Sequence, residues 1–413
     1  MESLVGARLE LEVLGPAAGG ACVARHDGRV VFVRHCLPGE RVVGVVTEDS
    51  GRFLRADAVE VLTASPERVP EPCPHARPGR CGGCDWQHAD GAAQRRIKGE
   101  VLREQFQRIA HLDVGNVPVE ELPGGLLGWR TRITFAVDGD GRPGLHRHRS
   151  ADLEHVGACP LGVAGVGDTD ALARTWPGQT GIEVARGDGS EVTLLAHRPG
   201  PGRQARGRRP PDRVDVVEGP ATLRHRLFDR DYEVAAGGFW QVHPAAADTL
   251  ARALLDAVAP QPGERVVDLY AGAGAFTAVL ADAVGPTGRV VGIESSAAAV
   301  ADAERNLAGQ PWAEVRRGRV DPAVVAGLEP TDLVVLDPPR AGAGAAVMQA
   351  LAGLAPRAIG YVSCDPATLA RDVSAAAAAG WRLAGLRVFD AFPMTAHVEC
   401  LATLRPDTPA FAP

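Results

Sequence analysis

The sequence predicts a multidomain protein whose C-terminal part is a doubly wound α/β domain, and three observations support this fold class. The chain has 413 residues, which is too long for one ordinary hydrophobic core. Residues 1–62 contain short β segments separated by turns with Gly or Pro, as in a small closed barrel. From Ala245 onward, strand-like runs alternate with alanine-rich helical stretches, which is typical of a sheet covered by helices. We expect a β-barrel at 1–62, an α+β domain at 63–235 and an α/β domain of Rossmann-like fold at 236–413.

The composition is that of a soluble globular protein, with 45% hydrophobic and 23% charged residues. The sequence has no run of about 18 apolar residues, and its start lacks the basic end and apolar run of a signal peptide. We therefore expect a cytoplasmic protein that does not enter a membrane. We also expect it to be a monomer. The net charge of −7 does not by itself indicate a nucleic-acid-binding protein. It does not exclude one either, because a local basic patch matters more for binding than the net charge of the chain.

Five β segments are expected in the first domain: Arg8–Val13, Cys22–His26, Val30–Arg34, Glu40–Glu48 and Phe53–Leu62. A loop with cysteines follows at 66–90, and a helix is expected over Gly91–Ile109. Three strand-like runs stand out in the second domain: Arg132–Val137, Glu191–Ala196 and Arg213–Val217. The stretch His197–Arg213 carries six arginines. We expect it to be a solvated loop, with contact to RNA as the alternative.

The third domain is expected to contain seven strands, at 265–269, 289–294, 313–317, 332–336, 357–363, 382–390 and 397–404. Most of them are separated by helical stretches, so their connections are those of a parallel sheet. The last two lack a long helical spacer. We therefore expect them to form an antiparallel hairpin at the edge of the sheet.

A glycine loop follows the first of these strands and predicts a cofactor site. It reads Asp268-Leu-Tyr270-Ala-Gly272-Ala-Gly274, and Glu294 ends the next strand, 22 residues after Gly272, at the spacing of an acid that binds a ribose diol. The alternative is a tight turn beside a solvated glutamate. A carboxylate at position 268 would repel a pyrophosphate but attract the sulfonium and amino group of S-adenosylmethionine, so this methyl donor is favoured over NAD.

Three reactive groups are expected near the same sheet edge. Asp337 follows the fourth strand in Asp-Pro-Pro-Arg, Cys364 follows the fifth strand in Ser-Cys-Asp-Pro, and Glu399 lies near the end of the chain. A thiolate, a methyl donor and a carboxylate suit methylation of carbon 5 of a pyrimidine. The thiolate adds to carbon 6, carbon 5 then takes the methyl group, and the carboxylate removes the carbon 5 proton.

Two other functions fit part of this pattern. The Asp337-Pro-Pro loop is similar to that of amino-group methyltransferases, which would not need Cys364. A non-catalytic RNA-binding scaffold with an iron–sulfur cluster and a degenerate methyltransferase domain is the second alternative, and the presence of both Cys364 and Glu399 speaks against it.

The chain resembles the S-adenosylmethionine-dependent RNA 5-methyluridine methyltransferases, which act on 23S rRNA or on the T-loop of tRNA. Five segments match in order: Gly-Gly-Phe-Trp-Gln-Val-His-Pro at 237–244, the Asp268 loop, Asp-Pro-Pro-Arg at 337–340, Ser-Cys-Asp-Pro at 363–366 and Phe-Pro-Met-Thr-Ala-His-Val-Glu at 392–399. The resemblance implies a class I methyltransferase domain. It further implies that Gln241 contacts the methyl donor, Asp337 the donor or the target base, while Cys364 attacks and Glu399 removes the proton.

Three positions depart from the family pattern. The family usually has Asn at the position of His243, often Cys at Ala271, and commonly Gln at Met394. None of them is the attacking thiol or the base, so the departures concern contacts to the methyl donor or to the substrate.

Four further cysteines predict a metal site. Cys73, Cys81 and Cys84 lie within twelve positions, and Cys159 is the candidate fourth ligand. Four thiols suit either tetrahedral zinc or an iron–sulfur cluster, and spacing alone leaves both open. The resemblance to rRNA-type members implies a 4Fe–4S cluster that stabilises the fold and the RNA surface.

RNA is the expected partner, with 23S rRNA favoured over tRNA. Residues 1–62 resemble the TRAM module, a small OB-type RNA-binding barrel, although a purely structural linkage is the alternative. Arg130 and Arg132 are candidate phosphate contacts, or else salt-bridged loop residues. A uridine in folded RNA would have to flip out, and Phe239 and Phe392 are candidates to stack on it.

Overall fold

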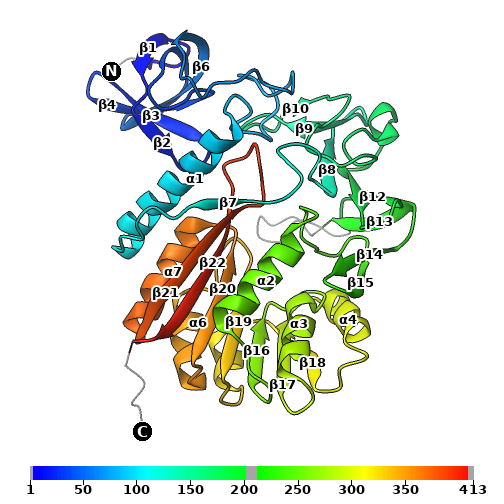
Figure 1. Cartoon of the computed structure of the whole chain (residues 1–413). Coiled ribbons are helices and arrows are strands. Elements are labelled where there is room, and N and C mark those ends of the chain that lie inside the picture. Colours follow the sequence, from blue (N-terminus) through cyan, green and yellow to red (C-terminus); the bar gives the residue numbers. More distant parts are fainter. Residues whose placement is uncertain (1–2, 201–211, 408–413) are drawn as a thin grey trace.

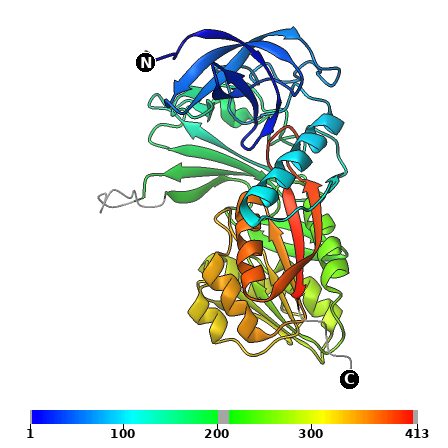
Figure 2. The ribbon, with the colours of Figure 1, turned by 90° about the vertical axis from the view of Figure 1, so that its left-hand side faces the viewer.

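The computed structural model describes residues 3–200 and 212–407 (Figure 1). Most of the arginine-rich stretch expected at 197–213 therefore lies outside the described residues. A β-sheet domain lies at one end of the molecule and a helix-covered sheet at the other, with a second sheet and a long helix between them (Figure 2). Within the two described ranges, no helix is long and apolar enough to cross a membrane.

The N-terminal domain is a curled six-stranded sheet with the order β1-β5-β6-β4-β3-β2. Its strands are β1 (Arg8–Glu12), β2 (Gly15–Ala17), β3 (Ala21–His26), β4 (Arg29–Arg34), β5 (Arg41–Asp49) and β6 (Phe53–Thr63). The five expected strands are present, and only the β4–β6 pair is parallel. The short β2 was missed because Gly-Pro-Ala carries no strand-like pattern. Alternate residues of β1, such as Leu9 and Leu11, face the core, as a half-buried strand requires.

Helix α1 (Gly91–Gln105) confirms the expected helix, and its last turn continues as a π-helical turn at Phe106–Ala110. The helix begins where the Asp90 carboxylate accepts a 2.7 Å hydrogen bond from the backbone N–H of Ala93, which is a regular N-cap. Ile97 packs into the N-terminal core, whereas Leu102 packs into the core of the C-terminal domain. One helix therefore links the two ends of the molecule.

The middle of the chain forms an antiparallel six-stranded sheet with the order β10-β9-β8-β11-β12-β13. These strands are β8 (Arg132–Val137), β9 (Pro143–His146), β10 (Leu153–Glu154), β11 (Gly181–Arg186), β12 (Val192–Arg198) and β13 (Arg213–Glu218). A separate hairpin follows, formed by β14 (Thr222–Leu227) and β15 (Arg230–Ala235). Phe135, Ile182 and Val184 lie in the core under the sheet.

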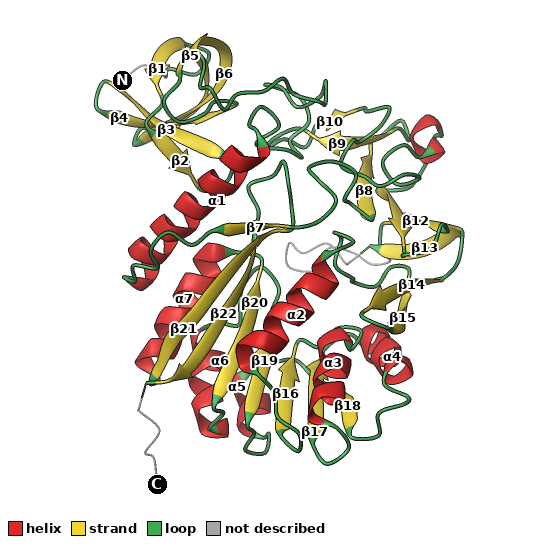
Figure 3. Cartoon of the chain, in the orientation of Figure 1, coloured by secondary structure: helices red, strands yellow, loops and turns green. Residues whose placement is uncertain are grey.

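The C-terminal domain confirms the predicted doubly wound sheet (Figure 3). Its strands are β16 (Arg265–Leu269), β17 (Arg289–Glu294), β18 (Ala313–Arg317), β19 (Leu333–Leu336), β20 (Ala358–Ser363), β21 (Trp381–Asp390) and β22 (Glu399–Pro406). Its helices are α2 (Ala246–Val258), α3 (Ala275–Val284), α4 (Ala297–Asn306), α5 (Pro322–Ala326), α6 (Ala345–Ala350) and α7 (Pro366–Ala378). The apolar faces of α2 and α3 share one core layer, and those of α5, α6 and α7 share the other.

The strand order is β18-β17-β16-β19-β20-β22-β21-β7, and β16 is flanked by β17 and β19. The chain therefore reverses its direction of winding at β16. In open α/β sheets, ligands bind at the carboxyl ends of the strands at this switch point. This position is where the sequence places the Asp268 loop and the Asp337 loop.

The last two strands pair antiparallel as expected, but they do not form the edge of the sheet. Strand β22 lies between β20 and β21, and the short β7 (Val119–Glu121), from the segment after α1, pairs parallel with β21 and forms the edge. The expectation of an edge hairpin was therefore wrong. The ion pair between Arg387 and Glu120, with an N–O distance of 2.8 Å, fastens this added strand.

Candidate active site

The glycine loop after β16 has a backbone shape that L-residues rarely adopt. Tyr270 has φ +66° and Gly272 has φ +55°, so the chain turns sharply at the end of the strand. The backbone N–H of Gly272 donates a 3.1 Å hydrogen bond to Oε2 of Glu294, at the end of β17. Gly274 has φ +82° and caps α3. The structure thus brings the two glycines, Tyr270 and Glu294 to one place.

Two carboxyl groups with raised pKa values lie beside this loop. Asp268 is 1% exposed, and its Oδ2 accepts a 2.5 Å hydrogen bond from Thr277 Oγ1. Burial raises the pKa of Asp268 to about 7, and the charge of Glu294 adds to the effect. Burial and the charge of Asp268 likewise raise the pKa of Asp337 to about 7. Among the residues that the structure describes, neither Asp268 nor Asp337 has an ion-pair partner, so a cationic group bound beside them, such as the sulfonium of S-adenosylmethionine, would meet carboxyls whose charge is not already compensated.

Cys364 and Glu399 are brought together by the pairing of β20 with β22. Ser363 is the register partner of Cys400 in this antiparallel pair. Cys364, which follows Ser363, therefore lies opposite Glu399, which precedes Cys400. The strand ends at the thiol because Asp365 caps α7, accepting a 2.8 Å hydrogen bond from the N–H of Thr368.

Burial raises the pKa of both groups of this pair in the free protein. Burial raises the pKa of Cys364 to about 11, and repulsion from Glu399 contributes. Glu399 is 3% exposed, and burial followed by repulsion from Asp337 raises the pKa of its carboxyl well above the usual range. The exposed Arg340 acts in the opposite direction on both, because its positive charge lowers the pKa of Cys364 and of Glu399.

Arg340 is a residue whose role sequence reasoning missed. It occupies the position where the related Asp-Pro-Pro loops have an aromatic residue, and this difference was the only signal in the sequence. Cys400, next to Glu399, is buried in the core of the domain and packs there.

The segment with Gln241 runs from β15 to α2 and lies against the loop before Glu399. Val242, within this segment, shares an apolar cluster with Phe392 and Met394, and its carbonyl accepts a 2.9 Å hydrogen bond from the N–H of Thr131. The ring of Phe239 is 68% exposed and available to stack on a base. The ring of Phe392 instead packs edge-on against Trp129, with centroids 6.1 Å apart.

Cys73, Cys81, Cys84 and Cys159 line one cavity, with about 480 Å³ of empty space, between the cysteine loop and the central sheet. Burial raises the pKa of Cys84 to about 12, and the charges of Cys159 and Cys81 add to it, as expected of neighbouring thiols. In the described parts of the chain, no three Cys, His, Asp or Glu side chains approach closely enough to hold one metal ion.

The two candidate phosphate contacts differ in their surroundings. Arg132 forms an ion pair with Glu183 on β11, which agrees with the alternative of a salt-bridged residue. Arg130 stacks over the ring of Trp129, 5.0 Å from its centroid, and lines the cysteine cavity. Its charge lowers the pKa of Cys84 and Cys159, although burial leaves both values raised.

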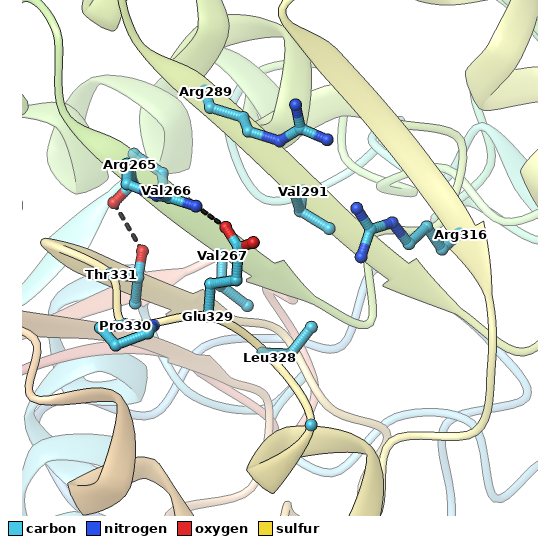
Figure 4. Close-up of a pocket in the computed structure, with 11 residues that line it drawn as sticks. Arg265, Val266, Val267, Arg289, Val291, Arg316, Leu328, Glu329, Pro330 and Thr331 are labelled. Atoms are coloured by element: carbon cyan, nitrogen blue, oxygen red, sulfur yellow. Dashed lines mark hydrogen bonds and ion pairs between the residues drawn. The ribbon is translucent and has the colours of Figure 1, made fainter.

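A pocket lies toward the amino ends of β16 and β17 (Figure 4). Its rim carries Arg265, Arg289 and Arg316. Arg265 pairs with Glu329, and the other two arginines pair with Glu314. Neither Asp268 nor Cys364 lines this pocket, and its positive charges are paired, so it is separate from the candidate active site.

Three segments of the chain match known protein families. Residues 2–59 match the TRAM domain, residues 329–406 match tRNA (uracil-5-)-methyltransferase, and residues 240–321 match protein-L-isoaspartate (D-aspartate) O-methyltransferase. A Streptomyces coelicolor protein described as an uncharacterized RNA methyltransferase is 49% identical over 98% of this chain and 94% of its own length. The 23S rRNA (uracil(1939)-C(5))-methyltransferase RlmD of Chromohalobacter salexigens is 35% identical over 95% of this chain and 88% of its own length. The chain belongs to the RNA uracil-5-methyltransferase family.

The fold of this methyltransferase is shared with a solved structure. The Pyrococcus abyssi tRNA (uracil-54, C5)-methyltransferase, determined with S-adenosyl-L-homocysteine, superposes with a TM-score of 0.70 and 22% identity over 96% of this chain and 100% of that chain. Family membership makes the protein an S-adenosylmethionine-dependent methyltransferase.

Proposed function

We propose that the enzyme transfers a methyl group from S-adenosylmethionine to carbon 5 of a uridine in RNA through a transient bond between Cys364 and carbon 6. The pairing of Ser363 with Cys400 carries this proposal, because it sets a thiol and a carboxyl side by side at the ends of two adjacent strands. The uncompensated carboxylates of Asp268 and Asp337 at the neighbouring strand ends support a cationic methyl donor there. An amino-group methyltransferase would have no use for the thiol.

The side chains have separate tasks in this reaction. S-adenosylmethionine supplies an electrophilic methyl group. We propose that it is held by residues of the glycine loop and the neighbouring strand ends: Gln241, Asp268, Tyr270, Gly272, Gly274, Glu294 and Asp337. The sulfur of Cys364 adds to carbon 6, and the electrons of the carbon 5–carbon 6 double bond move toward the carbonyl oxygen on carbon 4. Carbon 5 then takes the methyl group, and the sulfur–methyl bond breaks. Glu399 removes the proton from carbon 5, and the double bond re-forms as Cys364 leaves as a thiolate.

The raised pKa values of Cys364 and Glu399 favour a reaction in which the methyl donor binds before the thiol ionises. In the free protein, burial raises the pKa of the Cys364 thiol to about 11 and raises the pKa of the Glu399 carboxyl well above its usual range. A cation bound beside Asp268 and Asp337 would stabilise the ionised forms of the nearby carboxyls and of the thiol. We propose that binding of the methyl donor lowers these pKa values, and that Arg340 assists by favouring the thiolate.

The substrate that we propose is 23S rRNA rather than tRNA. A relative that aligns over most of its length is named as a 23S rRNA enzyme, whereas the solved structure that names tRNA is only 22% identical. The match of residues 2–59 to the TRAM domain supports contact between the N-terminal domain and RNA. The division of the chain at about residues 62 and 235 stays a proposal. The exposed ring of Phe239 is the better placed of the two stacking candidates.

We also propose that Cys73, Cys81, Cys84 and Cys159 hold a 4Fe–4S cluster. Their position around one common cavity supports it. The cluster would fix the loop that carries three of its ligands.

The experiment that tests the proposed function is covalent trapping with RNA that contains 5-fluorouridine. Fluorine cannot leave as a proton does, so the methylated adduct should remain attached to the wild-type protein and be absent from the Cys364→Ser variant. Mapping of 5-methyluridine in 23S rRNA and tRNA, in cells with and without the protein, identifies the substrate. A wild-type enzyme that methylates uridine but leaves no adduct would contradict the mechanism.

A further inference from the structure

Lys98 is the only lysine of the chain, whereas the other basic residues are arginines. It lies on α1, and its side chain is 1% exposed. Its Nζ donates a 2.5 Å hydrogen bond to Oδ1 of Asp390, whose side chain is also 1% exposed, and a 3.0 Å hydrogen bond to the carbonyl of Phe392. This is a buried ion pair between the linking helix and the catalytic domain.

The ion pair lies at the base of the loop that leads to Glu399. Asp390 ends β21 and Glu399 begins β22, so residues 391–398 connect the two strands. Phe389 is the register partner of Glu399. Lys98 therefore binds the chain at Asp390, one residue after Phe389, and binds it again at Phe392.

A second residue of α1, Gln94, forms hydrogen bonds with the same loop at Met394. Gln94 accepts a 2.7 Å hydrogen bond from the backbone N–H of Met394, and its amide nitrogen lies 3.2 Å from the sulfur of that residue. Met394 has φ +67°, a conformation that non-glycine residues adopt only when their surroundings hold them in it. The loop thus depends on α1 for its shape.

The chemistry of the contact explains why this position holds a lysine. A compact ammonium group can place its hydrogens on a carboxylate and on a carbonyl in different directions, whereas a guanidinium is a larger planar fork. Oδ2 of Asp390 is buried and has no hydrogen-bond partner among the described residues, so Lys98 alone compensates this carboxylate. A buried ion pair stabilises a fold weakly but specifies one arrangement when it fixes a contact.

We propose that Lys98 is a positioning residue for proton removal: through Asp390 and Phe392 it holds the loop that aims Glu399 at carbon 5 of the bound uridine. The inference rests on the proposed function. It separates two steps of the reaction. Attack by Cys364 and methyl transfer do not use the carboxylate of Glu399, whereas removal of the proton does.

The test uses the full-length protein in two matched variants. The double variant Lys98→Met with Asp390→Leu replaces the ion pair by apolar groups of similar size, and Asp390→Asn keeps the shape of the acceptor while weakening the contact. Arg96→Met, on the exposed side of the same helix, is the control. Thermal unfolding and binding of S-adenosylmethionine establish that each variant is folded.

Two measurements then decide the question. Trapping on 5-fluorouridine RNA reports attack and methyl transfer and should keep the wild-type rate in the double variant. Turnover on ordinary RNA should fall about 10- to 100-fold, and a covalent complex with ordinary uridine should accumulate, because a general base typically contributes about 100- to 10,000-fold and would here be misplaced rather than removed.

Unchanged turnover in the double variant would overturn the proposal, and so would an equal loss of trapping and turnover, which a purely structural role predicts. If the double variant does not fold, the same comparison in Asp390→Asn decides. Absence of trapping in the wild-type protein would instead refute the proposed function, so the two failures are distinguishable.

Discussion

The carboxylate of Asp85 accepts a 2.9 Å hydrogen bond from the backbone N–H of Ala396. Asp85 follows Cys84 directly, and Ala396 lies three residues before Glu399. Arg34, at the end of β4, completes the junction with a 3.2 Å ion pair to Asp85. The cysteine loop, the N-terminal sheet and the loop before the proposed base thus meet at one carboxylate.

Replacement of Asp85 should therefore affect catalysis from outside the crevice. In Asp85→Ala, the N–H of Ala396 and the guanidinium of Arg34 lose their acceptor, and we expect a loss of about 1 to 3 kcal/mol in the free energy of unfolding. We expect kcat to fall more than the affinity for S-adenosylmethionine. Asp140→Ala, at a side chain that is 82% exposed, is the control. Equal stability and kcat in the two variants would contradict the role of this junction.

Substitutions at the two proposed catalytic residues should give opposite trapping results. Cys364→Ser should form no adduct and lose turnover, because the nucleophile is removed. Glu399→Gln should lose about 100- to 10,000-fold in turnover yet accumulate the covalent complex with ordinary uridine, because only proton removal fails. Gel analysis of the protein–RNA complex measures both. A Cys364→Ser variant with wild-type turnover would favour the amino-group alternative.

Arg340 should set the pH dependence of adduct formation. Its charge lowers the pKa of Cys364, so Arg340→Leu should raise that pKa and reduce the thiolate fraction at a given pH. The profile of trapping rate against pH should therefore move to higher pH, whereas that of Arg317→Leu, an exposed arginine on β18, should not. A shift to lower pH in Arg340→Leu would disprove the assignment.

Asp268 should make the free protein less stable as the pH rises. Its pKa is about 7 in the folded protein and near 4 when unfolded, so the folded state holds the extra proton between these values. The associated stability is present below about pH 4 and is lost as the pH rises through about 7. We therefore compare the free energy of unfolding of Asp268→Asn with that of the wild type at two pH values. The difference should be about 1 to 3 kcal/mol more in favour of the variant at pH 8 than at pH 4. The variant should also lose affinity for S-adenosylmethionine. Thermal unfolding at the two pH values measures this, and an equal difference at both would contradict it.

The cysteine cavity makes a prediction about metal content. If the proposed cluster is bound, Cys159→Ser should lose iron and acid-labile sulfide and unfold at a lower temperature, because one of the four proposed ligands is missing. Cys22→Ala, in the N-terminal core, should keep its iron. Elemental analysis of the purified proteins checks this, and stoichiometric zinc without iron would show that the site holds zinc.

Local patterns in the sequence were enough to predict much of the fold. The valine-rich runs of β16 and β17 were predicted with their observed bounds, because buried parallel strands are continuously apolar. The segment Ser-Cys-Asp-Pro placed Cys364 at a strand end because Asp and Pro begin a helix.

Contacts between distant parts of the chain could not be predicted in this way. Strand β7 has three residues, and its partner lies far away in the sequence, in β21. The contacts of Lys98 with Asp390 and of Asp85 with Ala396 join residues 292 and 311 positions apart. No periodicity along the chain reports such pairs, because periodicity describes only which face of an element is apolar.

Helix α1 has a consequence for how the enzyme would measure its substrate. Because Ile97 is embedded at one end and Leu102 and Phe106 at the other, the N-terminal sheet is not a tethered module that swings on a linker. A nucleotide bound by this sheet would therefore lie at a fixed distance from the thiol of Cys364. The distance along the RNA between the bound nucleotide and the target uridine would then help to determine which uridine is modified.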